Sequence, residues 1–286
     1  MASKTAASKT LASKTLRVVT LNLWGDNGPW ADRLALAGDH LAALAPDVIT
    51  LQEVREVPAR VPNQAALLAE RLGFGYVFVP STAWGGGQEG LAVASRFPIG
   101  AHDASPLPHS TETEGRIVLS ARVDTDAGQI WVHTTHLSFR ETEGRKREEQ
   151  VLFLDGVVTA HKNDNPQIVT GDFNASPAHD EIRWMTGLCT LEGRRVAYQD
   201  AWERLNPGDP GVTWARANPY VGAMYWLRAD RRLDYVFVTP VRRDRRGTVH
   251  AARVVLDRAD GQGVRPSDHY GVLADVQTVA EPVPGT

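Results

Sequence analysis

Residues 169–177 read VTGDFNASP, and this short stretch decides how the rest of the chain is interpreted. The apolar run at 167–170 predicts a buried strand, and a glycine ends it. A carboxylate, an aromatic ring and an amide then follow in consecutive positions, before a proline. Because neither Asp172 nor Asn174 serves packing at such a turn, the pattern indicates that both side chains belong to a site.

The same pattern, an apolar strand that ends in a polar side chain, recurs along the chain. RVVTLNLWG (17–25) ends a predicted strand with Asn22, DVITLQEV (47–54) with Glu53, and QIWVHTTHLS (129–138) with His136. In RPSDHYGVLADV (265–276) the polar pair precedes the strand, so an antiparallel strand would bring it to the same rim. We therefore expect three carboxylates, two imidazoles and two amides around one cleft, namely Asn22, Glu53, His136, Asp172, Asn174, Asp268 and His269.

These groups together favour a divalent metal ion. Three carboxylates close to one another raise each other's pKa unless a cation neutralises them. Oxygen ligands, with no cysteine and no histidine pair at zinc spacing, favour Mg²⁺ or Mn²⁺ over Zn²⁺. A hard ion beside a positioned carboxylate suits hydrolysis at phosphorus, where the ion neutralises developing charge and the carboxylate orients the attacking water.

Each residue also has an ordinary structural explanation. Asn22 could cap the turn at 25–28, Glu53 could pair with Arg55 or Arg60, and Asn174 could form an Asx turn. For any single residue that explanation is the stronger one. It is the joint occurrence at successive strand ends that favours a functional site.

Composition is that of an ordinary globular protein. The chain has 286 residues, 42% of them hydrophobic, and a net charge of −3. We predict one domain over residues 16–280, with a disordered leader or tag at 1–15 and a tail at 281–286. No apolar run approaches the roughly 20 residues that span a bilayer, so no stable membrane insertion is expected, and no protein partner is implied. The single cysteine, Cys189, and the lack of a secretory signal favour a cytoplasmic location.

Short β-branched runs alternate with fewer helical patterns, which predicts an α/β protein with many short strands. The predicted strands cover residues 17–21, 47–51, 76–80, 90–95, 117–123, 129–135, 167–170, 233–238, 251–256 and 270–276. The predicted helices cover 30–44, 63–72 and 143–161. Segments 84–88, 206–227 and 258–266 are rich in Gly, Pro and aromatic residues and are interpreted as long loops.

Six short blocks follow one another along the chain in this order: LNLW, LQEV, THLS, GDFN, RLDYVFV and SDHYGV. They resemble the signature of the endonuclease/exonuclease/phosphatase superfamily, whose members include pancreatic-type deoxyribonuclease, abasic-site endonucleases, neutral sphingomyelinases and inositol polyphosphate 5-phosphatases. GLAVASRFPI is similar to a structural strand block of the same family. The resemblance covers nearly all of 17–276 and implies a four-layer α/β/β/α sandwich of two packed mixed β-sheets, with the site at one rim.

The resemblance also implies a role for each matching position. Glu53 is similar to the principal metal ligand, assisted by Asn22 and, for a second ion, by Asp268. Asp172 resembles the residue that orients or deprotonates the attacking water. Asn174 resembles the residue that holds the phosphate.

The two histidines match family positions as well. His269 resembles the histidine that contacts the scissile phosphoryl oxygen, with Asp234 of RLDY as its carboxylate partner, and such a partner raises an imidazole's pKa and fixes its tautomer. His136 resembles a second histidine that stabilises the transition state or donates a proton to the leaving oxygen. Trp24 departs from the family, because abasic-site and tyrosyl-DNA phosphodiesterase members have an acidic residue there.

The blocks leave the substrate open. LNLWG is closer to sphingomyelinase-like and bacterial members, whereas GVTWARANPY followed by RRLDYVFV is similar to the carboxy-terminal third of 5′-tyrosyl-DNA phosphodiesterases. There an aromatic residue near Trp214 approaches the substrate, and we predict that Trp214, Arg231 and Arg232 bind it. Two features support a nuclease: a cluster of arginines and a set of loop aromatics that could stack on bases. The negative net charge opposes this interpretation. The arginines are Arg228, Arg231, Arg232, Arg242, Arg243, Arg245 and Arg246, and the aromatics are Trp84, Trp214, Tyr220 and Trp226.

The sequence therefore predicts a hydrolase that uses Mg²⁺ or Mn²⁺ to cleave phosphoester bonds, favouring a phosphodiesterase that acts on a nucleic acid or a nucleotide-like substrate. The alternatives are a sphingomyelinase-like phosphodiesterase of phospholipid head groups and a phosphatase of sugar or inositol phosphates. A non-catalytic binding module on the same fold would require loss of a core site residue, and none of these residues is missing.

Overall fold

The computed structural model describes residues 15–222 and 229–281. Its elements, in chain order, are β1 (Thr15–Asn22), α1 (Trp30–Leu44), β2 (Val48–Glu56), α2 (Gln64–Leu72), β3 (Gly75–Trp84), β4 (Gly87–Ser95), β5 (Ile99–Pro106), β6 (Ile117–Thr125), β7 (Gly128–His136), the 3₁₀ turn η1 (Glu141–Glu143), α3 (Gly144–Ala160), β8 (Ile168–Asp172), α4 (Asp180–Met185), β9 (Gln199–Asp200), α5 (Ala201–Leu205), β10 (Asp234–Val238), β11 (Val249–Val255) and β12 (Gly271–Gln277).

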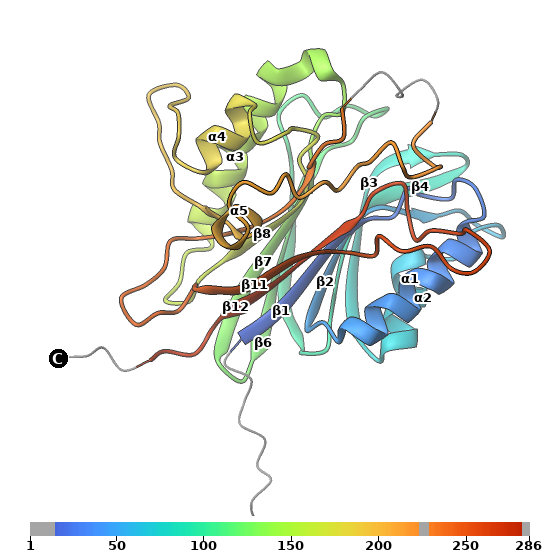
Figure 1. The fold of residues 1–286 in the computed structure, drawn as a ribbon, viewed down its shortest axis with the longest axis horizontal. Coiled ribbons are helices and arrows are strands. Elements are labelled where there is room, and N and C mark those ends of the chain that lie inside the picture. The colour runs from blue at the N-terminus through green and yellow to red at the C-terminus, as the bar shows by residue number, and fades with distance from the viewer. Residues whose placement is uncertain (1–14, 223–228, 282–286) are drawn as a thin grey trace, which may run out of the picture.

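The strands form two six-stranded sheets that lie against each other (Figure 1). The first sheet has the order β11-β12-β1-β2-β4-β3, and the second has the order β5-β6-β7-β8-β10-β9. Each sheet contains one parallel pair, β1–β2 in the first and β7–β8 in the second, among antiparallel pairs. Both sheets are therefore mixed, as the sequence predicts.

Three apolar clusters define four layers. One cluster lies between the sheets and draws on β1, β2 and β4 from one side and on β6, β7 and β10 from the other. A second cluster packs α1 and α2 against the outer face of the first sheet, and a third packs α3 and α4 against the outer face of the second. The predicted α/β/β/α sandwich is confirmed.

The helices begin and end where local chemistry allows. The Asn63 side chain accepts a hydrogen bond from the backbone N–H of Ala66 at 3.0 Å and caps α2. This helix ends at Gly73, whose φ of 70° is the left-handed conformation that glycine adopts without strain. In α1, Leu34, Ala37 and Leu41 are buried at helical spacing and face the sheet.

Several details differ from the expectations. The segment 84–88, predicted to be a loop, is a β-hairpin turn, because β3 runs to Trp84 and Gly85 and Gly86 both take positive φ, which reverses the chain tightly. Thr15, assigned to the leader, is the first residue of β1. Strand β5 was not predicted, since it is largely exposed and lacks an apolar pattern. The predictions for 1–14, 282–286, Trp226 and Arg228 concern residues outside the described ones.

Polar side chains cross between the two sheets near the strand ends that carry the predicted site. The Gln52 side-chain amide, from β2, donates to Thr134 Oγ1 on β7 at 2.9 Å. Thr170 Oγ1, from β8, donates to Thr50 Oγ1 on β2 at 2.8 Å. Because buried polar groups must be paired, these bonds fix how the sheets lie relative to each other in a way that apolar contacts alone do not.

His133 on β7 gives the fold a defined acid sensitivity. Its ring is fully buried between Ser120 Oγ and Gln167 Oε1, both at 2.9 Å, and burial lowers its pKa from 6.5 to about 4. The unfolded chain therefore binds this proton more readily, so the stability contribution is complete above pH 6.5 and is lost as the pH falls toward 4. We expect a loss of about 3 kcal/mol from this residue by pH 4.

Urea unfolding at pH 7 and at pH 4.5 checks this prediction. The His133→Gln variant should lose less stability than the wild type between these pH values, because glutamine keeps hydrogen bonding without titrating. The exposed His102→Gln variant serves as the control and should follow the wild type. Equal pH dependence in all three proteins would contradict the assignment.

Candidate active site

Asp172, the last residue of β8, stands at the centre of the site. The strand register pairs it with His136 on β7 and with Asp234 on β10. This close strand pairing depends on Gly171, whose φ is 137° and where a Cβ would lie 2.0 Å from the Thr135 carbonyl oxygen. The Gly-Asp order of GDFN is thus required by the backbone, and it places a buried carboxylate between two neighbouring strands.

Asn22 joins Asp172 to the first sheet. Its Nδ2 donates one hydrogen bond to Glu53 Oε1 and another to Asp172 Oδ2, each at 3.1 Å. Its Oδ1 accepts from the backbone N–H of Trp24 at 2.9 Å. One amide therefore caps the turn after β1 and also holds carboxylates from both sheets together, so the ordinary and the functional explanations of Asn22 both apply.

The backbone bends at two of the site residues. The pairing of β2 with β4 shifts register between Leu51 and Val54, and Glu53 within this bulge has a φ of 51°. Asn174 has a φ of 49°, with its N–H donating to Asp172 Oδ1 at 2.8 Å. Left-handed conformations are costly for side chains other than glycine and concentrate at functional sites. The bulge turns the Glu53 carboxylate toward Asn22.

His269 faces two carboxylates. Its Nδ1 lies 2.9 Å from Asp234 Oδ2, and its Nε2 lies 3.7 Å from Asp172 Oδ2. His136 approaches the same oxygen of Asp172, with its Nε2 at 3.5 Å. Asp234 is completely buried, and its Oδ1 has no hydrogen-bond partner among the described residues. The predicted His269–Asp234 pairing is present.

The charges in this cluster are strongly coupled. Burial raises the pKa of Asp172, and the nearby Asp234 charge raises it further. Burial also raises the pKa of Asp268, to about 7. For His269 burial lowers the pKa, but the three surrounding carboxylates outweigh it and hold the pKa well above its ordinary value. Burial and the Arg116 charge hold the pKa of His136 well below its ordinary value. At neutral pH His269 is therefore protonated and His136 is neutral.

Residues that the sequence did not single out hold the site loops. Thr213 Oγ1 accepts hydrogen bonds from the backbone N–H groups of Leu233 and Asp234, at 2.9 and 3.2 Å. The Asn218 amide donates to the carbonyl oxygens of Ser267 and Asp268, at 2.9 and 3.1 Å. Both residues lie in GVTWARANPY (211–220), where the family resemblance singled out only Trp214. The sequence signal that could have identified them is a polar side chain within a loop rich in glycine and proline.

Arg33 of α1 performs a similar task from the other side. Its buried guanidinium donates to the carbonyl oxygens of Leu23 and Pro266, at 2.8 and 3.0 Å. It thereby connects the turn after Asn22 with the loop before Asp268. Nothing in the sequence distinguishes this arginine from a surface residue of the helix.

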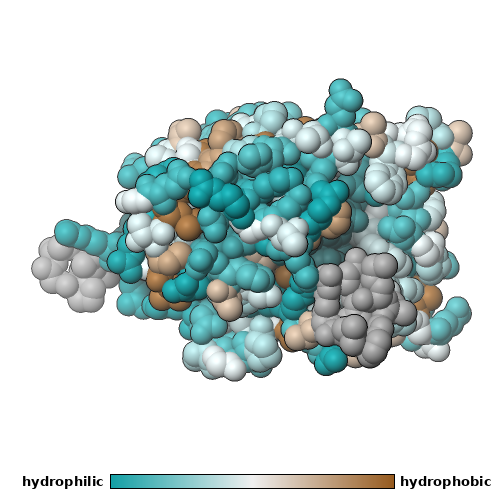
Figure 2. Space-filling view, turned by 90° about the horizontal axis from the view of Figure 1, so that it is seen from above, coloured by the Kyte–Doolittle hydropathy of each residue, from teal (hydrophilic) through white to brown (hydrophobic). Residues whose placement is uncertain are grey.

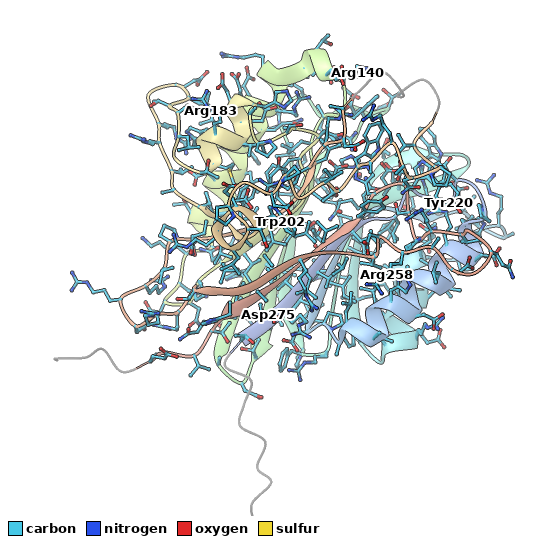
Figure 3. The ribbon with its side chains drawn as sticks, viewed as in Figure 1. Arg140, Arg183, Trp202, Tyr220, Arg258 and Asp275 are labelled. Carbon is cyan, nitrogen blue, oxygen red and sulfur yellow. The ribbon has the colours of Figure 1, made fainter. Side chains whose placement is uncertain are left out.

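The acidic and histidine side chains of the site border a cleft of about 870 Å³. Figure 2 looks onto the molecule from above and shows a mostly hydrophilic surface with scattered hydrophobic groups. In Figure 3 the cleft residues Arg140 and Tyr220 lie far from Asp275, which pairs with Arg17 at the opposite end of β1. The cleft is lined by eight of the predicted site residues: Glu53, His136, Asp172, Asn174, Trp214, Arg231, Asp268 and His269. Asn22 and Asp234 are buried directly behind it.

One predicted substrate contact is not brought to the cleft. Arg232 is buried, and its Nη1 lies 2.6 Å from Asp200 Oδ2, so the position of Arg232 contradicts a substrate-binding role. The proposed arginine patch is also divided: the guanidinium of Arg242 donates to the carbonyl oxygens of Asn163 and Asn165, away from the cleft. Adjacent positions in a sequence alternate in direction along extended chain, which separates Arg231 from Arg232.

The donor set fits a divalent cation. Asp172, Asp234 and His269 each offer a ligand atom within 4.8 Å of the others and could hold a metal ion. Asp234 Oδ1 is a buried carboxylate oxygen without a hydrogen-bond partner among the described residues, and a cation would satisfy it. Asp234, however, is fully buried and already engaged by His269, whereas Glu53 opens into the cleft, where a hard ion keeps its water ligands.

The comparisons agree with this arrangement. Residues 19–269 match the model of the Endonuclease/Exonuclease/phosphatase family, and the chain therefore belongs to that family. No curated protein sequence matches the chain. The member defined here combines the α/β/β/α sandwich with a buried Asp/Asp/His cluster able to hold a metal ion.

Three solved structures illustrate the shared fold. Danio rerio TDP2, complexed with a single-strand DNA product, is 23% identical and gives a TM-score of 0.72, covering 92% of this chain and 98% of that one. A Beutenbergia cavernae endonuclease/exonuclease/phosphatase is 24% identical, with a TM-score of 0.70 and 95% and 73% of the two chains covered. The human Nocturnin catalytic domain is 21% identical, with a TM-score of 0.68 and 92% and 94% covered.

Cation binding should stabilise the folded protein measurably. Because Glu53 and Asp268 present carboxylates to the cleft, we expect Mn²⁺ or Mg²⁺ at about 100 times its Kd to raise the melting temperature by about 5 °C or more relative to EDTA. The Glu53→Gln variant should lose most of this increase. Asp155→Asn, which alters an α3 carboxylate bound to Tyr198 and Arg194, is the control and should retain it. An equal increase in Glu53→Gln would contradict the location of the ion.

Proposed function

We propose that this protein is a divalent-metal-dependent phosphodiesterase that cleaves a nucleic acid or a nucleotide-like substrate, with Mg²⁺ or Mn²⁺ as its ion. The observation that supports this most is the position of Asp172. Both of its oxygens are held by hydrogen bonds, from Asn22 and from the Asn174 backbone, and both histidines face it across the cleft.

Asp172 is the group that orients the attacking water. Its raised pKa makes it a stronger base than an exposed carboxylate, and its two hydrogen bonds prevent rotation. A water held by such a carboxylate attacks phosphorus in line with the leaving oxygen. Asn174, two residues further along the chain, lines the same cleft; its side-chain amide donates to the Leu137 carbonyl oxygen at 3.1 Å and would hold a phosphate oxygen with its other N–H.

The two histidines have different tasks because their charges differ. Protonated His269, oriented by Asp234, donates from Nε2 to a phosphoryl oxygen and stabilises the charge that develops there. Neutral His136 donates a hydrogen bond to the leaving oxygen. A preformed pair of donors on either side of one carboxylate is the arrangement that phosphoester hydrolysis needs.

The metal ion is assigned to the Glu53 side of the cleft. Glu53 and Asn22 would hold it, with Asp268 available for a second ion. When bound, the ion neutralises charge on the phosphoryl group and supplies the positive charge that the carboxylate cluster lacks. The strained conformation of Glu53 supports this role, since an ordinary ion pair with an arginine would not need it.

A nucleic-acid substrate is supported by the cleft walls. Tyr220 lines the cleft beside Trp214, whose ring is 6% exposed and lies 4.7 Å from the guanidinium carbon of Arg231. Aromatic rings beside cations are the usual contacts for unpaired nucleotides. The likeness to a protein solved with single-strand DNA adds to this, at the level of fold.

Hydrolysis of bis-p-nitrophenyl phosphate, compared with p-nitrophenyl phosphate, tests the proposed reaction. The wild type should cleave the diester with Mg²⁺ or Mn²⁺, and EDTA should abolish the activity. Asp172→Asn and Glu53→Ala should each lower kcat/KM by about 100-fold or more, because each removes a group that acts on the transition state.

The unfolding temperatures of both variants in EDTA must stay close to that of the wild type for this comparison to hold. Full activity in either folded variant would contradict its assigned role. Cleavage of the monoester alone would contradict the phosphodiesterase and favour a phosphatase.

A further inference from the structure

The tip of the β3–β4 hairpin forms one wall of the cleft. Trp84, the last residue of β3, lines the cleft, and 52% of its surface is exposed. The guanidinium carbon of Arg55 lies 4.3 Å from the centre of its ring. Arg55 itself is buried, with 4% of its side chain exposed. One face of the indole therefore covers a buried cation, while the ring stays accessible from the cleft.

This pair is held rigidly. Arg55 on β2 is paired in register with Glu89 on β4, and its Nη2 lies 2.5 Å from Glu89 Oε2. The Arg55 backbone N–H donates to Gln64 Oε1 at 2.8 Å. Two positive-φ glycines, Gly85 and Gly86, complete the tight turn that follows Trp84. A platform fixed in this way loses little conformational entropy when a ligand binds on it.

Arg55 also has hydrogen-bonding capacity that the described residues do not use. Its Nε and Nη1 are buried and have no hydrogen-bond partner there. A buried guanidinium with unpaired N–H groups costs free energy. Asp26 Oδ1, 3.8 Å from Arg55 Nε, and Glu89 compensate the charge, and the feature of this wall that a ligand can reach is the exposed face of the Trp84 ring.

The position of the platform relative to the reacting centre is set by the sheet. Strand β3 is two strands away from β2, which carries Glu53. Neighbouring strands lie about 4.8 Å apart, so the Trp84 backbone is about 10 Å from β2, and its ring reaches back over Arg55, two residues beyond Glu53. A ring stacked on Trp84 therefore belongs to a group beside the scissile phosphate and not to the phosphate itself.

We propose that Trp84 and Arg55 form a stacking subsite for the aromatic base of the nucleotide next to the phosphodiester that is cleaved. This rests on the proposed function and names the substrate as single-stranded nucleic acid. A planar base stacks on the exposed face of such a ring, and stacking of this kind tolerates every base.

Single-stranded oligonucleotides that carry a base-free sugar at one position at a time test the proposal. At one position beside the cleavage site, removal of the base should lower the wild-type kcat/KM by about 10-fold. Trp84→Ala should cleave the intact oligonucleotide about 10-fold more slowly and should no longer respond to base removal at that position. Trp84→Phe, which keeps an aromatic face, should recover most of the loss.

Tyr76→Ala is the matched control, since Tyr76 is an aromatic residue on the same strand, 43% exposed, that does not line the cleft. This variant should behave as the wild type does. The subsite is overturned, while the proposed function stands, if Trp84→Ala cleaves the intact oligonucleotide at the wild-type rate. The same holds if this variant loses as much activity as the wild type does when the base at that position is removed. If the wild type cleaves bis-p-nitrophenyl phosphate but no oligonucleotide, the nucleic-acid substrate is overturned as well.

Discussion

The side-chain amide of Asn22 is the contact on which the site depends. Its nitrogen donates to Glu53 from the first sheet and to Asp172 from the second, so it holds two carboxylates together across the boundary between the sheets. Carboxylates at such short range repel each other, and a shared donor offsets part of that repulsion before any ion binds. Apolar packing between the sheets supplies the stability, and this directed contact, with the hydrogen bonds of Gln52 to Thr134 and of Thr170 to Thr50, fixes the spacing of the acidic groups.

The backbone around this contact is strained in a consistent way. Glu53 and Asn174, on different sheets, both take left-handed conformations, and Gly171 allows a strand approach that no side chain would permit. These features cost stability and are retained where function needs them. The same packing sets the charges of the two histidines. The buried carboxylates that surround His269 keep it protonated, while burial keeps His136 neutral.

The strands and the polar residues at their ends were predictable because they rest on local patterns: β-branched runs make the strands, and the polar residue that ends each one reaches the rim. The four-layer sandwich was predictable only from the resemblance to the superfamily. The sequence could not predict the fate of Arg232, since the burial of that arginine depends on Asp200, a partner distant in the chain. The hairpin at Trp84 was missed because its glycines resemble those of a loop. Arg33 was not predicted because it donates to backbone carbonyl oxygens, which every residue type carries, so its partners cannot be recognised in the sequence.

We expect the acidic cluster at the Asn22 contact to bind a divalent ion beside a phosphodiester. Anomalous diffraction at the manganese edge tests this on crystals grown with Mn²⁺ and a phosphorothioate dinucleotide that resists cleavage. An anomalous peak should appear in the cleft within bonding distance of Glu53, with the phosphorothioate group facing Asp172 and His269. A well-occupied manganese peak elsewhere, with the dinucleotide bound outside the cleft, would contradict it.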